Sequence, residues 1–389
     1  MKYMGHKGKL LPVLGEILKH QSKNSKRIAD PFCGSGVVSW FLARETEKIV
    51  VSGDLQSFAV ARAAAVVERT TCVDATSLIN FWFESAKTIV NNILGHFPNE
   101  ARSISPDQTS CGEIQTAVAR SRAFCEFVLP PILEKVGGNF PMALAYGGHY
   151  FSPLQALELD ALRQTIPTDA DLKKVCLAAL IESASRCSAS PGHTAQPFQP
   201  TVTASKYIAE AWSRDVWTLT KQSVAAISNT QANVKGSAII GDYKKIISGL
   251  EPGDLVFADP PYSDVHYSRF YHVLETLVRG TPIKVFGVGR YPGIQERPSS
   301  NFSQRAQSMS AASDLIEACI SQKVHLVLTF PHHKASNGLK ALDFVRFATG
   351  KFSSITAEVV ESTFSTLGGS ADNRGGRQKC KESIISFTL

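Results

Sequence analysis

Two acidic, turn-forming segments constrain the fold of this chain most strongly, because each directly follows a short strand-like run. The first is Asp30-Pro31-Phe32-Cys33-Gly34-Ser35-Gly36, and the second is Asp259-Pro260-Pro261-Tyr262 after the apolar run Leu255–Ala258. In open α/β sheets, ligands bind beyond the carboxyl ends of the strands. Two such strand ends in one sheet would form a single pocket with two acidic corners.

Alternating strand and helix patterns in the first seventy residues predict a parallel, doubly wound α/β sheet. The strands expected over the whole chain are Arg27–Asp30, Ile49–Asp54, Ala238–Asp242, Asp254–Asp259 and Val324–Phe330. The clearest helices expected are Leu10–Leu18, Gly36–Arg44, Leu55–Glu68, Leu154–Leu162, Leu172–Ala184, Arg269–Val278 and Leu339–Phe347. Two β-rich segments, Ile355–Phe364 and Glu382–Leu389, flank a basic, Gly-rich loop at Gly368–Lys381 and predict a C-terminal β-hairpin on the sheet edge.

The middle of the chain has helical patterns and few strand signals. We therefore predict one domain that is split into residues 1–80 and 236–389, with a mostly helical insertion at residues 81–235. An insertion of this length is more typical of a functional subdomain than of a loop.

Composition limits the classes of protein that fit. The 389 residues are 43% hydrophobic and 19% charged, which is ordinary for a globular protein with a large core. The net charge of +7 is compatible with a phosphate-rich partner but does not require one. The eight cysteines form no C-x-x-C pair and no zinc-like spacing, which indicates a reducing compartment. No secretory signal and no apolar run of about 20 residues is visible, so we expect a cytoplasmic protein with no membrane attachment.

The first motif has the residues of a cofactor loop. Gly34 and Gly36 permit positive φ and close backbone approach, and the following helix offers unpaired N–H groups. Asp54 ends the next strand, where an acid suits a ribose diol. The dinucleotide fingerprint is not met, because Ser39 stands at its third glycine position. Asp30 would repel a phosphate but could hold an ammonium, so S-adenosylmethionine fits, with a plain glycine turn as the alternative.

The second motif has the residues of an amine clamp. Two prolines fix φ near about −65° and remove two backbone donors, which frees the Pro260 carbonyl to point into a pocket beside Asp259. These two acceptors can take both hydrogens of an exocyclic NH2 group, while Tyr262 stacks on the flat base that carries it. Such a base must leave its helix before it fits. The alternative is a stiff turn with a solvent-facing Asp259.

Together these motifs resemble the D12 class of DNA adenine-N6 methyltransferases, the Dam-like group. The matching pieces occur in the family's order and are Tyr3-x-Gly5-x-Lys7, DPFCGSG at 30–36, Asp54, Gly241-Asp242-Tyr243 and DPPY at 259–262. The resemblance implies a Rossmann-like sheet that uses S-adenosylmethionine, with the target-recognition region in the insertion. It covers the first seventy and the last hundred and fifty residues.

The resemblance also implies roles for individual residues. Asp259, Pro260, Pro261 and Tyr262 would hold the target base. Asp30, Gly34 and Gly36 would hold the methionine part of the cofactor, Asp54 its ribose, and Asp242 and Tyr243 its adenine, with Tyr3 and Lys7 beside the cofactor and the active site. The full expected cofactor set is Tyr3, Lys7, Asp30, Pro31, Phe32, Gly34, Gly36, Asp54, Asp242 and Tyr243.

Several cations and aromatic residues outside the motifs are candidates for DNA contact. They are Tyr267, Arg269, Arg290, Arg297, Arg374 and Arg377. Helix capping and solvated loops are the alternatives for these residues. We predict no metal site, because the side chains of the His332-His333 pair diverge and no acid partner is evident.

The sequence therefore predicts methyl transfer from S-adenosylmethionine to N6 of a flipped adenine in DNA. Two alternatives stay open: methylation of cytosine N4 or of an RNA base, and a non-catalytic DNA-binding protein that retains the fold. DNA is the expected partner, and proteins of a restriction or phage-defence system are further candidates. The sequence does not give the recognition site or the oligomeric state.

Overall fold

The computed structural model describes residues 3, 5, 7–97, 110–365 and 377–389. The chain forms two compact units. The helical unit comprises residues 1–3, 72–229 and 269–297, and the sheet unit comprises residues 4–71, 230–268 and 298–389. The helical segment thus begins at 72 rather than 81 and ends at 229 rather than 235, and residues 269–297 pack with it. That these units are a catalytic and a recognition domain stays a prediction.

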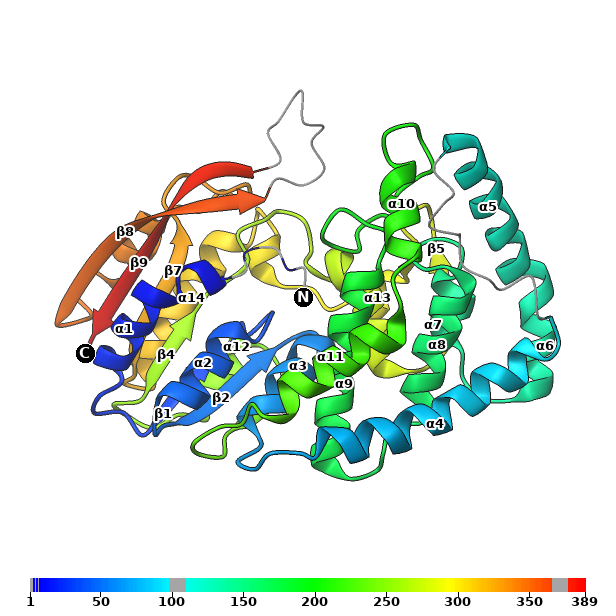
Figure 1. The fold of residues 1–389 in the computed structure, drawn as a ribbon. Helices are drawn as coiled ribbons and strands as arrows, with labels where there is room; N and C mark the ends of the chain where they lie inside the picture. The colour runs from blue at the N-terminus through cyan, green and yellow to red at the C-terminus, as the bar shows by residue number, and fades with distance from the viewer. Residues whose placement is uncertain (1–2, 4, 6, 98–109, 366–376) are drawn as a thin grey trace. The chain divides into compact units, whose positions relative to one another are not determined.

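The sheet unit is built on a seven-stranded sheet with the order β3-β2-β1-β4-β7-β9-β8 (Figure 1). The first five strands in this order run parallel, and β9 and β8 are antiparallel to their neighbours. The strands are β1 Arg27–Asp30, β2 Ile49–Asp54, β3 Ser237–Ile240, β4 Leu255–Ala258, β7 His325–Pro331, β8 Ser354–Ser365 and β9 Arg377–Thr388. The predicted mixed α/β class with a mostly parallel sheet is confirmed, and it is compatible with a methyltransferase fold.

Helices cover both faces of this sheet. The helices of the sheet unit are η1 Lys7–Lys9, α1 Leu11–Gln21, α2 Val37–Glu45, α3 Ser57–Val67, α12 Tyr243–Ile247, η4 Asn301–Ser303, α14 Ser308–Ser321 and α15 Ala341–Ala348. On β4, Leu255 and Phe257 pack with α1, α2 and α3, whereas Val256 and Ala258 pack with α12, α14 and α15. Central parallel strands that are buried on both faces are expected to read as continuous apolar runs, as β4 does.

The register of the central strands places the two motifs together. β1 pairs in parallel with β4 through Ile28↔Leu255 and Ala29↔Val256. Asp30 ends β1, and Asp259 directly follows β4. Both acids therefore lie at the carboxyl edge of neighbouring strands, where the sequence analysis placed them.

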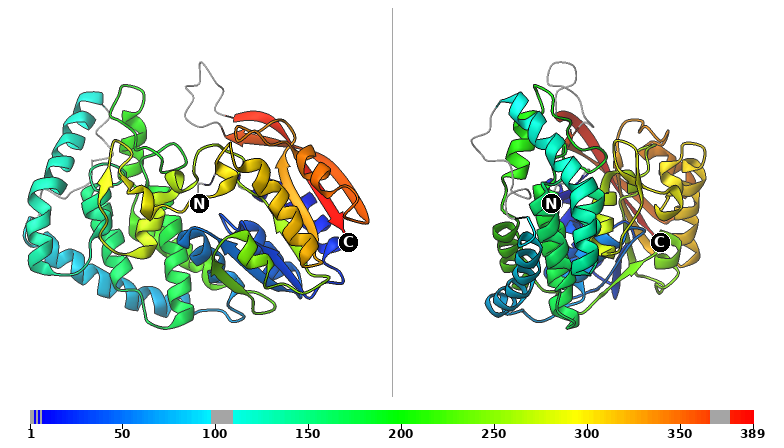
Figure 2. Two further views of the ribbon diagram at one scale, coloured as in Figure 1. Left: turned by 180° about the vertical axis from the view of Figure 1, so that it is seen from behind. Right: turned by 90° about the vertical axis from the view of Figure 1, so that its right-hand side faces the viewer.

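The predicted C-terminal hairpin is confirmed, but one of its bounds was wrong. β9 begins at Arg377, whereas we expected a loop as far as Lys381. The β8–β9 ladder runs unbroken from Ser365↔Arg377 to Ser354↔Thr388. The last residue pair between β7 and β9 is Pro331↔Glu382, so residues 377–381 extend past it and pair with β8, the edge strand of the sheet (Figure 2).

The helical unit is held by capped helices around a mainly apolar core. Its elements are α4 Ala75–Leu94, α5 Cys111–Ala123, the π-helical turn η2 Phe124–Val128, α6 Leu129–Val136, α7 Pro141–Tyr146, α8 Pro153–Gln164, α9 Ala170–Cys187, α10 Ser205–Trp212, α11 Val216–Ser228, α13 Ser268–Arg279, β5 Val285–Phe286, β6 Tyr291–Pro292 and η3 Ile294–Glu296. Asp74, Ser110 and Asp215 accept backbone N–H groups at the starts of α4, α5 and α11. The buried Trp82 donates to the Leu162 carbonyl at 2.8 Å and so ties α4 to α8.

The seven predicted helices correspond to α1, α2, α3, α8, α9, α13 and α15, each within three residues at either end, whereas the other eight α-helices of the described residues were not predicted. Of the predicted helices, α13 departs from a regular helix. Tyr271 has φ −134° and ψ 15°, so two helical pieces meet there at a kink. Of the helices that the structure describes, none has the length and apolar content needed to cross a membrane.

Candidate active site

The cofactor-loop motif forms a tight turn between β1 and α2. Gly34 and Gly36 have φ of 47° and 73°, which disfavours any residue with a Cβ atom. A Cβ on Gly36 would lie 3.4 Å from Trp40 Nε1 and 3.5 Å from the backbone nitrogen of Ala63. The Gly34 N–H donates to Asp54 Oδ2 at 3.0 Å, so the acid at the end of β2 holds the loop itself.

Asp30 is a buried acid with one unsatisfied oxygen. Ser39 Oγ donates to Asp30 Oδ2 at 2.6 Å, while no residue in the described part of the chain hydrogen-bonds to the buried Oδ1. Burial raises the pKa of Asp30 to about 7; the Ser39 hydrogen bond lowers it in part, and the charges of Asp259 and Asp54 raise it further. A buried carboxylate oxygen without a partner is costly, and a cationic group would satisfy it. The ammonium of an amino-acid cofactor is such a group.

Phe32 lies in an aromatic cluster beside this loop. Its ring stacks on Tyr243 at 5.6 Å and meets Phe302 edge-on at 5.6 Å. Tyr243 is buried, and its hydroxyl lies 3.4 Å from the Ala311 carbonyl, which it can donate to. Asp242 accepts the Lys245 N–H at 2.9 Å and caps α12. The contacts of Asp242 and Tyr243 with a cofactor adenine stay predictions.

The loop that carries DPPY is anchored by a residue outside every motif. Asn337 is fully buried, and its Nδ2 donates to the carbonyl of Pro261 at 3.1 Å and to that of Phe302 at 3.0 Å. The Tyr262 ring meets Phe330 edge-on at 6.5 Å. A Cβ on Gly5 would lie 3.0 Å from Tyr262 Oη. Gly5 of the N-terminal motif therefore lies directly against the DPPY tyrosine.

Lys7 forms the main electrostatic contact of the site. Its Nζ lies 3.0 Å from Asp259 Oδ1 and 2.5 Å from Glu382 Oε1. Thr329 Oγ1 also donates to Asp259 Oδ1, at 2.9 Å. Burial raises the pKa of Asp259 to about 6, with Lys7 lowering it and Glu382 raising it. Burial lowers the pKa of Lys7, but the two carboxylates outweigh this and raise it overall.

Glu382 and Thr329 were missed by the sequence analysis, as were Asn337 and Phe302. Glu382 lies on β9 opposite Pro331 of β7, and Thr329 is on the same strand as Pro331. No motif marks these positions, because their place in the site depends on the β7–β9 register. The one local signal for Glu382 was an acid at the start of the predicted β-rich segment Glu382–Leu389.

Two of the predicted tyrosines occupy different surroundings. Burial raises the pKa of Tyr267, and its interactions with Tyr262 and Asp259 raise it further, so Tyr267 belongs with the DPPY loop. Tyr3 belongs to the helical unit, where its ring stacks on Tyr271 at 4.6 Å and 12°.

The predicted DNA-contacting arginines fall into two groups. Arg269 and Arg297 lie over the ring of Tyr291, with guanidinium carbons 4.8 and 5.5 Å from its centre. Neither has a carboxylate partner among the residues that the structure describes. Arg290 instead donates to the carbonyls of Ala145 and Leu144 at the end of α7. Arg374 lies outside the described residues, and only the backbone of Arg377 is described.

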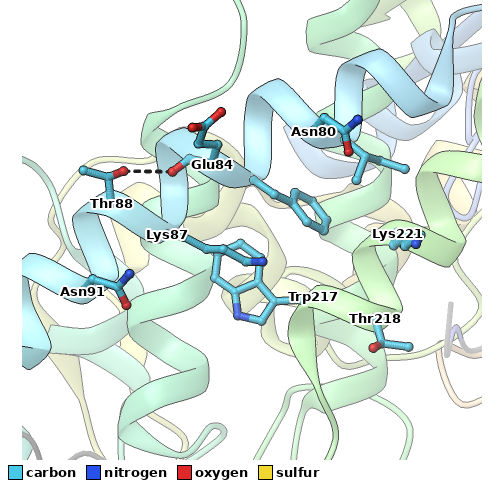
Figure 3. A pocket seen from close by; sticks show the side chains of 10 residues that line it. Asn80, Glu84, Lys87, Thr88, Asn91, Trp217, Thr218 and Lys221 are labelled. Atoms are coloured by element: carbon cyan, nitrogen blue, oxygen red, sulfur yellow. Dashed lines mark hydrogen bonds between the residues drawn. The ribbon is translucent and has the colours of Figure 1, made fainter.

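A separate hollow of about 600 Å³ lies between α4 and α11 of the helical unit (Figure 3). No residue of either motif lines it. The ring of Trp217 is covered by Lys87 at 5.5 Å, and its Nε1 donates to Glu158 at 2.8 Å. The Trp217 side chain in this hollow thus already contacts Lys87 and Glu158. Because both motifs lie elsewhere, the candidate site is the carboxyl edge of the sheet.

Comparison with known proteins finds two similarities. Residues 3–100 match the family model of the D12 class N6 adenine-specific DNA methyltransferases. The match supports the resemblance seen in the motifs and includes Lys7, Asp30, both loop glycines and Asp54. The chain is also similar to the modification methylase StsI of Streptococcus sanguinis, with 21% identity over 340 residues. The aligned region covers 85% of this chain and 44% of the relative, so the chain spans less than half of that protein.

Proposed function

We propose that this protein transfers a methyl group from S-adenosylmethionine to the N6 amine of an adenine in DNA. One observation carries the proposal: Asp30 and Asp259 lie at the carboxyl ends of adjacent parallel strands, and each offers a carboxylate oxygen for a ligand. An ammonium-holding acid beside an amine-holding acid is the pairing that amine methylation from this cofactor requires.

The residues around the cofactor loop fit the proposed cofactor. The unsatisfied Oδ1 of Asp30 would hold the ammonium of its methionine part, and the turn at Gly34 and Gly36 leaves room for close backbone approach. Asp54 accepts the N–H groups of Gly34 and Gln56, and a carboxylate at the end of this strand is also of a type that binds ribose hydroxyls. When bound, the cofactor supplies a methyl group on a positively charged sulfur, which becomes a neutral thioether once the amine nitrogen has taken that group.

Asp259 would first orient the amine, and its carboxylate or water would take the displaced N–H proton only after the methyl group has moved to nitrogen. Its Oδ1 already accepts from Lys7 and Thr329, and no partner of Oδ2 occurs among the described residues, so Oδ2 is open to an N–H of the target base. The Pro260 carbonyl would accept the second hydrogen. With a pKa of about 6, Asp259 is mainly a carboxylate at neutral pH and can act as this acceptor. Holding the amine in line with the methyl carbon supplies much of the rate enhancement.

Adenine in DNA is supported by the family match and by the order of the motifs. The StsI relative is a modification methylase, which agrees with a role in DNA modification. Arg269 and Arg297 would contact DNA phosphates, since neither pairs with a carboxylate in the described part of the chain. The binding energy from such contacts falls with added salt.

Nucleoside mass spectrometry of DNA from cells that lack adenine methylation tests the proposal. We expect N6-methyladenine with the wild-type chain and none with Asp259→Ala. Detection of N4-methylcytosine would show that cytosine in DNA is the substrate, and a methylated base in RNA would show that RNA is the substrate. If neither nucleic acid carries a new methyl group while the purified chain still binds DNA, the protein is a binding protein and the proposal is wrong.

A further inference from the structure

We propose that Lys7 and Glu382 are paired positioning residues, which set the orientation of Asp259 and keep its Oδ2 atom open to the target amine. The inference rests on the proposed function and adds to it, because it assigns a role to Glu382 and a second role to Lys7. It is carried by the geometry of one buried ammonium between two carboxylates.

The three charges come from parts of the chain that are far apart in sequence. Lys7 is in η1, Asp259 follows β4, and Glu382 is on β9. The side chain of Lys7 is 6% exposed, that of Asp259 19% and that of Glu382 11%. Removing such charges from water is costly, and each partner that is lost leaves an uncompensated charge. Because burying these three charges is costly, we infer that the cluster has a role in the site.

The contacts fix which oxygen of Asp259 remains available. Lys7 Nζ and Thr329 Oγ1 both approach Oδ1, from η1 and from β7. Two donors on one oxygen fix the rotation of the carboxylate about its Cβ–Cγ bond. Oδ2 then faces no donor among the described residues and can accept from a substrate.

Glu382 prevents Lys7 from neutralising Asp259 completely. An ammonium with a single carboxylate in a buried site would be free to bridge both of its oxygens. The 2.5 Å contact with Glu382 Oε1 holds Nζ on the Oδ1 side and shares its charge between two acids. With one positive and two negative charges, the cluster keeps a net negative charge beside the amine.

Other titratable groups also act on Asp259 and are included in the test. Asp30 at the end of β1 and Tyr267 beyond the DPPY loop interact electrostatically with it. Neither forms an ion pair with Asp259 among the described residues. Lys7 and Glu382 are therefore the groups whose neutralisation changes its charge environment most directly.

The proposal predicts opposite pH shifts for two neutral, near-isosteric variants. Activity requires the Asp259 carboxylate, so activity is present above the pKa of about 6 and is lost as pH falls through that value. This fall in activity is the acid limb of the pH profile. Lys7→Gln removes the charge that lowers this pKa, so the acid limb moves to higher pH by about 1 unit. Glu382→Gln removes a charge that raises it, so the acid limb moves to lower pH.

The experiment measures single-turnover methylation from pH 5 to 8 alongside the 13C chemical shift of the Asp259 carboxyl, assigned with Asp259→Asn. Lys7→Arg keeps the positive charge and should leave the acid limb near its wild-type position. Matched controls are Lys9→Gln in η1 and Glu358→Gln on β8, both exposed, which should move neither readout. Circular dichroism and thermal melting check that each variant is folded.

The outcomes separate this inference from the proposed function. The inference is supported if Lys7→Gln and Glu382→Gln shift the acid limb in opposite directions and shift the carboxyl titration in the same two directions. The inference is overturned if both variants shift the pH profile in the same direction, or if neither shifts it. A purely structural defect would lower activity without shifting the two profiles in opposite directions. If the wild-type protein methylates nothing, the proposed function fails, while the carboxyl titration in the substrate-free protein still decides whether Lys7 and Glu382 control Asp259.

Discussion

The side chain of Asn337 donates a hydrogen bond to the Pro261 carbonyl, 3.1 Å from Nδ2, and so fixes the DPPY loop from outside the motif. The same amide donates to the Phe302 carbonyl at 3.0 Å and accepts the Leu339 N–H at 3.1 Å. One buried side chain thus satisfies three backbone groups. Its loss would leave those groups without partners inside the protein.

We expect Asn337→Ala to destabilise the protein by about 2–4 kcal/mol, because buried groups without partners cost about 1–3 kcal/mol each. The turnover rate should fall further than the affinity for the cofactor, since Asn337 contacts the DPPY loop and not the cofactor loop. Urea unfolding and single-turnover methylation measure the two effects. Asn92→Ala, at an exposed position of α4, should change neither. A variant at Asn337 that keeps normal turnover would show that the loop holds its own shape.

A methyl group at Gly5 should displace Tyr262. Gly5 has φ +71°, and its added Cβ would lie 3.0 Å from Tyr262 Oη. Gly137 has nearly the same φ, +76°, but nothing lies within 4 Å of an added Cβ. Gly5→Ala and Gly137→Ala should therefore share a backbone cost of about 1 kcal/mol, and Gly5→Ala alone should lower turnover, by at least about tenfold. Equal turnover in the two variants would argue against a role for this contact.

The parts of the site that sequence could predict are those encoded by local residues. The bounds of β1 and β2 were predicted as Arg27–Asp30 and Ile49–Asp54, because each strand is a short apolar run ended by an acid and a turn. If these strands pair in parallel, the acids at their carboxyl ends must lie along the same edge of the sheet. Asp30, Asp54 and Asp259 could be placed in the site for this reason alone.

The parts that sequence could not predict depend on register and on loops far along the chain. Glu382 reaches Lys7 because β9 pairs with β7 at Pro331↔Glu382, and no local pattern determines that register. Asn337 lies in the loop between β7 and α15, where an Asn is expected simply to form a turn. The charge of Arg290 was visible in the sequence, but its hydrogen bonds to the Ala145 and Leu144 carbonyls were not, because they depend on packing against a helix far away in the chain.

Asp30→Asn should abolish tight cofactor binding and leave the fold intact. The amide keeps the shape of the side chain but cannot pair with an ammonium, so we expect the dissociation constant to rise by at least about tenfold. In the wild-type protein the pKa of Asp30 is raised from 3.8 to about 7. Cofactor affinity should therefore weaken as pH falls below about 7, because the carboxylate is the binding form. Calorimetry from pH 6 to 8 measures this slope, which Asp30→Asn should remove.

The same variant makes a prediction about stability. A carboxyl group whose pKa is raised by burial binds more protons in the folded state, so it lowers stability as pH rises from about 4 to 7. Asp30→Asn removes that penalty and should raise the melting temperature of the cofactor-free protein at pH 8 relative to the wild type, with a smaller difference at pH 5. A variant that is less stable at both values would show that Asp30 is a structural acid.

The arginines of the helical unit should separate into DNA-contacting and structural residues. Arg297 lies over Tyr291 without a carboxylate partner in the described part of the chain, so its charge is available for a phosphate. Arg297→Gln should weaken DNA binding at low salt and reduce the slope of log Kd against log salt by about 1. Arg290→Gln should instead lower the melting temperature, because it leaves carbonyls at the end of α7 without donors, and should keep the wild-type salt slope. Fluorescence anisotropy with one duplex at several salt concentrations gives both slopes. A reduced slope for Arg290→Gln with no change for Arg297→Gln would reverse the assignment. The phosphate contact would then lie at Arg290, although its guanidinium already donates to the carbonyls of α7.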